Sequence, residues 1–156
     1  MKLFFEQKNL KWFDKYNIYD ESGNVVFVVK SEMPLVPSVT IQDVQGNELS
    51  AIVREFALMP TFEFYRGEEL LGSISRKLSF FTPRYEIDYN GWKAEGDFLG
   101  WDYQITDAAG RCVAEMHKES IDILNESYSL DVKNPEDALG ALMVALAIDL
   151  EGDAKN

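Results

Sequence analysis

NPEDALGALMVALAIDLEG, residues 134–152, is the stretch of the chain that most clearly predicts an α-helix. Asn134 is a residue type that favours the N-cap, and Pro135 fits the first helical position, where a backbone N–H has no intrahelical partner. Glu136 and Asp137 then place negative charge in the first turn, where the helix dipole is positive. These signals predict a helix that begins directly after Asn134.

The body of this helix, residues 138–148, has no polar face, and Gly152 marks its expected end. A helix that is apolar on all sides lies either in a membrane or inside a protein. About a dozen apolar residues fall short of the roughly 20 that a membrane span requires. The pattern therefore predicts no transmembrane segment and a helix that the rest of the chain encloses.

Five segments upstream alternate apolar and polar residues, as a half-buried β-strand does, and each leads into a turn that contains Asn, Asp or Gly. They are Tyr16–Asp20, Val39–Asp43, Phe62–Arg66, Tyr85–Tyr89 and Tyr103–Asp107. A second extended arm follows each turn, so each segment predicts a β-hairpin. Asn90-Gly91 is the strongest turn signal, because a type I′ turn needs positive φ at both central positions.

Two further strands, Leu3–Gln7 and Tyr128–Val132, bring the expected total to about a dozen. A helix with its side chains is about 10–12 Å across, so a barrel around it needs more strands than the roughly eight that fill their own interior. The expected fold is mainly β, a closed antiparallel barrel of about twelve strands enclosing a C-terminal hydrophobic α-helix. Residues 1–156 are expected to form this single domain.

Charge and cysteine content limit the classes of partner and the compartment. The formal net charge of −12 opposes non-specific attraction to nucleic acid, so we expect no nucleic-acid partner. The single cysteine, Cys112, excludes an internal disulfide and fits a reducing compartment. Glu6, Gln7 and Lys8 interrupt the apolar run at the amino terminus, which is therefore too short for a signal peptide. These features predict a cytoplasmic protein.

Residue types for metal binding or nucleophilic catalysis are scarce. The chain has one histidine, His117, and one cysteine, Cys112, and their odd spacing places them on opposite faces of a regular strand. Adjacent carboxylates such as Glu68 and Glu69 fall in expected turns, and no glycine-rich phosphate loop precedes the helix. We therefore expect no metal, no cofactor and no enzymatic activity.

The most suggestive cluster consists of Arg76, Lys77 and Arg84, which flank the pair Phe80 and Phe81 on two arms joined by a short loop. Cations beside aromatic residues predict a site for a phosphorylated or lipid-like ligand, with phenylalanines placed for peripheral membrane contact. In the alternative interpretation, the cations pair with acids on neighbouring strands and the phenylalanines pack over one end of the barrel.

Aromatic residues elsewhere suggest a second class of partner. Trp12, Phe13, Trp92 and Trp101 would mark a protein-binding surface if exposed, and would cap or fill the barrel if buried. The expected function is thus a non-enzymatic binding or scaffold domain for a small anionic or lipid-like ligand. A protein–protein interaction module in a stress response is the alternative, and an enzyme with an unrecognised site is the third.

The chain carries the motifs YNIYDESGNVVFVV (16–29), TPRYEIDYNGWKAEGDFLGWDYQITD (82–107) and EDALGALMVALAIDLE (136–151). Their combination resembles the LURP-one-related proteins, which belong with the C-terminal domain of the tubby proteins. The resemblance implies a closed barrel of about twelve strands around a central hydrophobic helix. Tubby domains bind phosphoinositides and scramblase relatives act at membranes, so the resemblance agrees with a phosphorylated or lipid-like ligand.

Overall fold

The computed structural model describes residues 1–6, 15–32, 38–79, 81–119 and 127–153. The described strands are β1 (Lys2–Glu6), β2 (Lys15–Tyr19), β3 (Val25–Glu32), β4 (Ser38–Gln42), β5 (Glu48–Glu55), β6 (Thr61–Arg66), β7 (Glu69–Lys77), β8 (Arg84–Asp88), β9 (Lys93–Asp97), β10 (Asp102–Thr106), β11 (Cys112–Lys118) and β12 (Ser127–Val132). A 3₁₀ helix, η1 (Pro135–Asp137), and the α-helix α1 (Ala138–Asp153) follow them.

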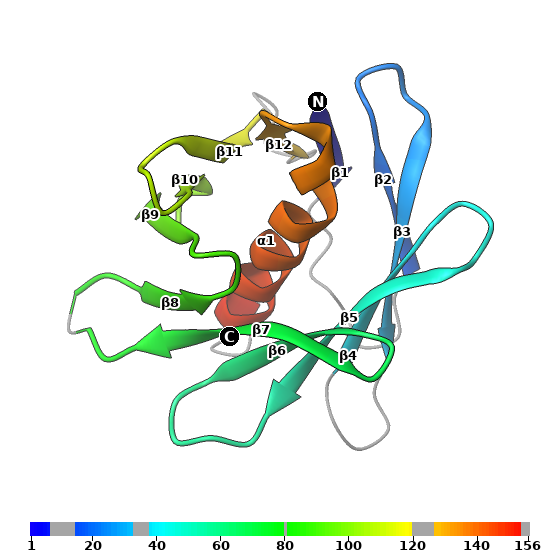
Figure 1. Cartoon of the computed structure of the whole chain (residues 1–156). Coiled ribbons are helices and arrows are strands. Elements are labelled where there is room, and N and C mark those ends of the chain that lie inside the picture. Colours follow the sequence, from blue (N-terminus) through cyan, green and yellow to red (C-terminus); the bar gives the residue numbers. More distant parts are fainter. Residues whose placement is uncertain (7–14, 33–37, 80, 120–126, 154–156) are drawn as a thin grey trace.

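The strands form one antiparallel sheet of 12 strands that curls around α1 (Figure 1). Strands that follow one another in the chain pair from β1 to β8 and from β9 to β12, and β1 also pairs with β12. The expected twelve-stranded barrel around a helix is therefore confirmed. The sheet has two edges, β8 and β9, which are consecutive in the chain but share no hydrogen-bonded ladder in the described residues. The barrel is nearly closed, with one open seam.

Helix α1 fills the interior because all of its sides are apolar. Ala138 and residues 141–148 are buried, and Leu142 has no exposed surface. These side chains form one continuous core with inward-facing residues of the strands, such as Phe64 and Leu130. Removal of apolar surface from water contributes about 25 cal/mol per Å², so the helix and the barrel wall stabilise each other.

The start of the helix differs from the expectation. Residues Pro135–Asp137 form a 3₁₀ turn, closed by a bond of 2.9 Å from the Asp137 N–H to the Asn134 carbonyl. Asn134 is extended, and its side chain caps no backbone N–H but donates to Glu136 Oε1 at 2.6 Å. The α-helix extends to Asp153, so Gly152 lies inside its last turn.

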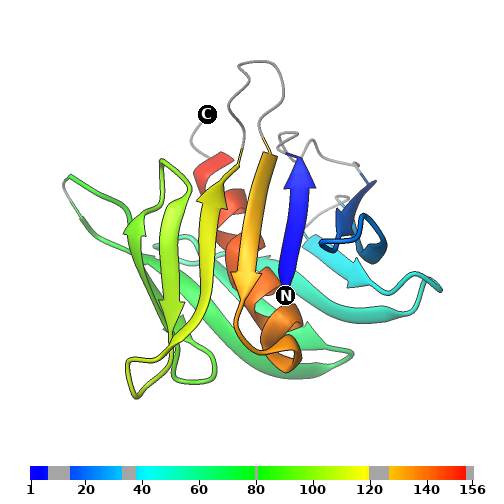
Figure 2. The same cartoon turned by 90° about the horizontal axis from the view of Figure 1, so that it is seen from above.

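The connections between strands alternate between two ends of the barrel. One end, here called the turn end, carries the tight turns after β2, β4, β6, β8 and β10, together with Met1. At the opposite end, here called the loop end, lie residues 56–60, 78–79, 81–83 and 98–101 and the carboxyl end of α1. Figure 2 shows the N-terminus and the last turn of α1 at these opposite ends.

Three turns at the turn end have the same structure. Asp20, Asp43 and Asp107 each accept bonds from the backbone N–H groups two and four residues later, at 2.8–3.0 Å. A carboxylate that binds its own following backbone pre-forms a turn, because it replaces the bonds that a ladder would supply. The hairpins expected after these three segments are confirmed by the pairing of β2 with β3, β4 with β5, and β10 with β11.

Candidate functional site

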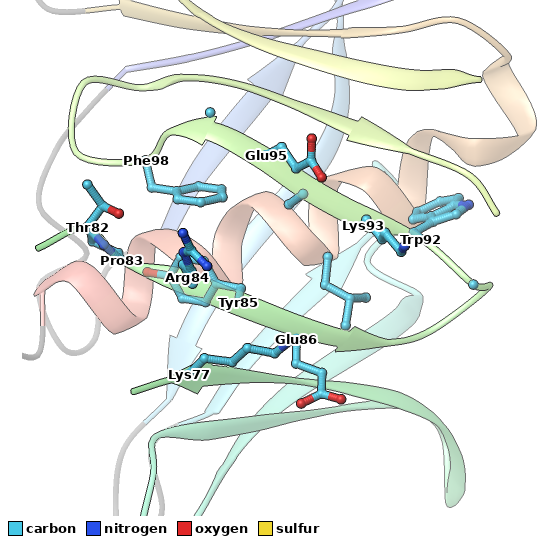
Figure 3. A pocket seen from close by; sticks show the side chains of 14 residues that line it. Lys77, Thr82, Pro83, Arg84, Tyr85, Glu86, Trp92, Lys93, Glu95 and Phe98 are labelled. Atoms are coloured by element: carbon cyan, nitrogen blue, oxygen red, sulfur yellow. The ribbon is translucent and has the colours of Figure 1, made fainter. Parts of the chain in front are cut away.

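A cleft of about 800 Å³ lies at the open seam, between β8 and β9 (Figure 3). Its floor consists of inward-facing, mostly apolar side chains, because alternate residues of a strand point to the same face. The floor residues are Tyr85, Ile87, Trp92, Ala94 and Phe98. A volume of this size lies within the range of small-molecule sites, which is roughly 300–1,000 Å³.

The turn between the two walls forms as expected, but the hairpin does not. Asn90 and Gly91 have φ values of 54° and 68°, and the Trp92 N–H donates to the Tyr89 carbonyl at 3.0 Å. The predicted pairing of the arms is wrong, since β8 and β9 are the two edges of the sheet. A hairpin continued from this turn would place Glu86 directly opposite Glu95, and like charges at that position are destabilising.

Packing against the helix holds this turn in place. The rings of Tyr89 and Trp92 meet edge to face with their centroids 5.2 Å apart. Both reach the helix at Gly140, where a Cβ atom would lie 2.7 Å from the Tyr89 hydroxyl and 3.0 Å from the Trp92 ring. The glycine therefore permits a close approach that a side chain would obstruct, and the start of the seam is set by contacts with α1.

Positively charged side chains lie at both ends of the outer edge of the cleft, here called the rim. Lys77 and Arg84 are cross-strand neighbours in the register of β7 and β8, and both are exposed. Lys93 lies at the other end of the cleft, beside Trp92 (Figure 3). In the part of the chain that the structure describes, none of the three forms an ion pair with a carboxylate. In the described residues, acids on neighbouring strands therefore do not neutralise Lys77 and Arg84, as the alternative interpretation expects.

The structure does not bring Arg76 to the cleft with Lys77 and Arg84. Its Nη1 atom donates to Glu151 Oε1 at 2.8 Å, and the Tyr85 hydroxyl donates to Glu151 Oε2 at 2.7 Å. Glu151 is 3% exposed and the Arg76 side chain 17% exposed. Arg76 therefore ties the last turn of α1 to the inner face of the barrel wall, whereas Lys77, its neighbour in sequence, faces outward.

Three aromatic rings line the wall above this ion pair. Phe98 lies 4.9 Å from Tyr85 and 5.0 Å from Tyr103, measured between ring centroids. Burial raises the pKa of the Tyr85 phenol, and the hydrogen bond to Glu151 raises it further. Burial likewise raises the pKa of Tyr103, whose hydroxyl has no hydrogen-bond partner among the described residues. The two phenols near this end of the cleft therefore stay protonated and uncharged at neutral pH.

The two phenylalanines of the expected site have different outcomes. Phe80 lies outside the described residues. Phe81 is 96% exposed and does not pack over the barrel end. It belongs to a set of large apolar side chains that are exposed at the loop end: Phe56, Leu58, Leu78, Phe81 and Leu99. The ligand-binding role expected for both phenylalanines stays a prediction.

The tryptophans that the structure describes are part of the core or its cover. Trp92 is 5% exposed, and Trp101 packs on Tyr128 and Phe5 with centroid distances of 4.4 and 6.5 Å. They do not form an exposed aromatic patch. Trp12 and Phe13 lie outside the described residues.

Within the described ranges, no three side chains of the types His, Cys, Asp and Glu converge on a point that could hold a metal ion. The His117 Nε2 atom lies 3.2 Å from Glu115 Oε2, and the Cys112 thiol contacts Glu115 as well. The expected placement of Cys112 and His117 on opposite faces is therefore wrong, because the register of β10 and β11 shifts between Cys112 and Ala114 and interrupts the alternation. Burial, and then the charge of Glu115, raise the pKa of Cys112, which disfavours the thiolate. None of the described helices is both long and apolar enough to cross a membrane.

Sequence reasoning missed Lys93 and the cleft itself. The available signal was the pair of acids, Glu86 and Glu95, which would oppose each other across the Asn90-Gly91 turn. A like-charge pair weakens a ladder only slightly, as the paired Lys77 and Arg84 of β7 and β8 show, so it does not by itself predict the open seam.

Comparisons with known proteins agree with this architecture. A protein from Bacillus subtilis, "Uncharacterized protein YxjI", is 26% identical over 152 residues, which cover 96% of this chain and 93% of that protein. The X-ray structure of a protein from Arabidopsis thaliana superposes with a TM-score of 0.65 at 17% identity, covering 96% of this chain and 91% of that one. The LURP-one-related family model matches residues 1–151. The chain therefore belongs to the LURP-one-related family.

Proposed function

We propose that this protein is a non-catalytic binding module that holds a phosphorylated ligand in the cleft between β8 and β9. The observation that supports this most directly is the pair Lys77 and Arg84, which lie side by side at the rim without an acidic partner in the described residues. Adjacent like charges repel each other, and an anion between them would relieve that repulsion. A phosphate group, with charge of about −1.5 to −2 at pH 7, matches two cations better than one carboxylate does.

The floor supplies the second half of the site. Tyr85, Ile87 and Phe98 offer apolar surface in the same cleft, so the ligand is expected to carry an apolar part beside its phosphate. Arg76 contributes indirectly in this proposal. Its bond to Glu151 fixes the strand that carries Lys77, and its charge is not available to the ligand.

A thermal-shift titration with inorganic pyrophosphate, phosphorylated metabolites and phospholipid head groups tests the proposal. A ligand that binds only the folded state raises the melting temperature. The doubly substituted variant Lys77→Glu, Arg84→Glu is expected to lose the shift. Lys15→Glu, Arg66→Glu is the matched control, because it changes one exposed lysine and one exposed arginine outside the cleft and alters net charge equally.

Three results would decide the matter. Loss of the shift in the cleft variant but not in the control supports the site. Equal loss in both variants would mean that overall charge, and not the cleft, attracts the anion. No shift with any phosphorylated compound would overturn the proposed function and favour a protein partner.

A second candidate function is contact with a lipid interface through the loop end. Phe56, Leu58, Leu78 and Phe81 are all exposed there on neighbouring connections, and exposed apolar tips of this kind insert into the headgroup region of bilayers. Because the net charge of −12 opposes anionic lipid, we expect binding to neutral phosphatidylcholine vesicles rather than to phosphatidylserine. Vesicle flotation with Leu58→Asp, Phe81→Asp tests this, and unchanged flotation would refute it.

A further inference from the structure

We propose that the phosphorylated ligand also carries a positively charged amine, placed two or three carbon atoms from its phosphate group. This inference rests on the proposed function, since it names the chemical class of the ligand for the same cleft. It comes from two side chains that the phosphate argument does not use, the carboxylates of Glu86 and Glu95, which line the cleft together with the cations.

Glu86 lies next to the proposed position of the phosphate. In the register of β7 and β8, Lys77 is opposite Arg84, and Glu86 follows Arg84 by two positions. Residues two apart in a strand point to the same face and lie roughly 7 Å apart. A phosphate held by Lys77 and Arg84 therefore has a carboxylate on the same outward face, at a distance that a short aminoalkyl group can span.

The two carboxylates are free to meet a ligand. Figure 3 shows Glu86 and Glu95 on opposite walls of the cleft, and both are exposed. Their cross-strand neighbours are uncharged, Ser75 for Glu86 and Gln104 for Glu95. In the part of the chain that the structure describes, neither carboxylate forms an ion pair or a hydrogen bond. Both negative charges are thus uncompensated.

The balance of charge in the cleft also favours a ligand with both signs. The cleft is lined by three cationic and two acidic side chains, Lys77, Arg84, Lys93, Glu86 and Glu95, an excess of one positive charge. A phosphate group alone carries about −1.5 to −2 at pH 7, which exceeds this excess and brings repulsion from the acids. An amine on the same molecule lowers the net charge to about −0.5 to −1, which matches the cleft.

The chemistry of a carboxylate selects the kind of amine. A primary ammonium group has three N–H donors, and hydrogen bonds between charged groups are the stronger ones. A quaternary ammonium group has no donor and matches Glu86 less well. The carbon atoms between amine and phosphate can lie on the apolar surface of Tyr85 and Ile87 in the same cleft. The ligand class is therefore a phosphate ester of an amino alcohol, either free or as the head group of a phospholipid.

Two compounds that differ only in the amine test this inference. O-phosphoethanolamine and ethyl phosphate have the same phosphate and the same carbon chain. An exposed ion pair changes affinity by a factor of about 1.5 to 5, and we expect the upper end of this range because the amine also relieves the repulsion between phosphate and Glu86. Thermal-shift titrations of the intact chain at low salt should thus give an apparent Kd about fivefold lower for O-phosphoethanolamine. Equal affinities would overturn the inference.

Glu86→Gln is expected to change the two affinities in opposite directions. The neutral amide loses its attraction for the amine, so O-phosphoethanolamine should bind about threefold more weakly. The amide also no longer repels phosphate, so ethyl phosphate should bind more tightly. Asp88→Asn is the matched control, because it removes an exposed acid from the same face of β8 outside the cleft; it should leave the preference for the amine unchanged. A shift of both compounds in the same direction in Glu86→Gln would refute its role in recognising the amine.

Vesicle flotation distinguishes the two sources of this chemistry. Phosphatidylcholine vesicles with and without phosphatidylethanolamine are compared, and free O-phosphoethanolamine is added as a competitor. Association that requires phosphatidylethanolamine and is displaced by the free compound supports a lipid head group. Binding of the free compound without vesicle association supports a soluble amino phosphate.

The outcomes separate this inference from the proposed function. If ethyl phosphate and O-phosphoethanolamine both fail to bind, the phosphate site is wrong and the amine falls with it. If both bind equally and both are lost in Lys77→Glu, Arg84→Glu, the phosphate site is retained and the amine is refuted. If ethylamine binds as tightly as O-phosphoethanolamine, and both persist in that variant, the acidic side chains bind an amine and the phosphate site is refuted.

Discussion

The ion pair between Arg76 and Glu151 yields the sharpest prediction about stability. Replacing Arg76 with Met removes the guanidinium while keeping a side chain of similar length. Glu151, which is 3% exposed, then loses its guanidinium partner and keeps the hydrogen bond from the Tyr85 hydroxyl. A buried carboxylate that loses its cationic partner is costly, because burial limits how far water can compensate its charge.

The distances set the size of the effect. At 2.8 Å, Coulomb's law with an effective dielectric constant of about 20 gives an attraction of about 6 kcal/mol, which the cost of desolvating both groups offsets in large part. Removal of one partner from such a pair costs about 3–5 kcal/mol. Because the whole domain is expected to be stable by only about 5–15 kcal/mol, Arg76→Met should lower the urea midpoint markedly.

Urea unfolding followed by tryptophan fluorescence measures this, and a double-mutant cycle isolates the pair. Arg76→Met, Glu151→Leu removes both charges and is expected to recover most of the stability, because an apolar pair of similar volume replaces an ion pair at little or no cost. If Arg76→Met alone unfolds within about 0.5 kcal/mol of the wild type, the side chain is not committed to Glu151. Arg76 would then be available to a ligand after all.

Three further predictions follow from the core and the seam. Leu142→Asp places a charge at a position with no exposed surface. This substitution is expected to prevent folding, since its cost of several kcal/mol approaches the total stability of the domain. Soluble Leu142→Asp protein with a cooperative thermal melt would refute the enclosed helix. The raised pKa values of Tyr85 and Tyr103 mean that folding favours the protonated phenols, so their contribution to stability is full below the unfolded pKa of about 10 and falls above it. Tyr103→Phe should therefore flatten the decline of the melting temperature with rising pH. An unchanged slope would contradict the raised pKa of Tyr103. Gly96→Ala is expected to destabilise the fold, because the φ of Gly96 is 137° and the added Cβ would lie 2.6 Å from the Asp102 carbonyl oxygen. A melting temperature at or above that of the wild type, measured by calorimetry, would show that the backbone of β9 and β10 can shift to accept the methyl group.

Much of the fold follows from local pattern. Alternation of apolar and polar residues and Asx-type turns predict strands such as β2, β4 and β10, because each pattern depends on a few neighbouring residues. The apolar helix predicts its own enclosure for a similar reason: no arrangement in water leaves residues 138–148 exposed. The arrangement of twelve strands around one helix can therefore be predicted from the sequence.

The open seam was not predictable from the turn alone. Asn90-Gly91 forms its expected turn, but the fate of the arms depends on Gly140 of a helix about fifty residues away, and on how Tyr89 and Trp92 pack there. Local turn chemistry sets the backbone of four residues, and tertiary contacts decide whether the ladder continues.

The site residues illustrate the same division. Lys77 and Arg84 share one face in the register, as the proposed phosphate site requires. Arg76 was grouped with them by proximity in sequence, although strand periodicity places it on the face of Ile74, which is buried. Applying the alternation rule within the cluster would have separated Arg76 from its neighbour. The acidic partner, Glu151, could not be identified from the sequence because it lies 75 positions further along the chain.

Helix α1 supports one wall of the cleft at two points, and this bears on how the seam can bind. Tyr85, at the start of β8, is bonded to Glu151, while Tyr89, directly after β8, packs at Gly140. A strand edge held at both ends by the core keeps its position without a ladder partner. Binding then orders little of the protein, and pre-organisation of this kind improves affinity because fewer groups lose freedom. Arg76→Met should consequently weaken ligand binding as well as folding, although it leaves Lys77 and Arg84 in place. A variant that lost stability but bound with wild-type affinity would show that the helix is not needed to hold β8.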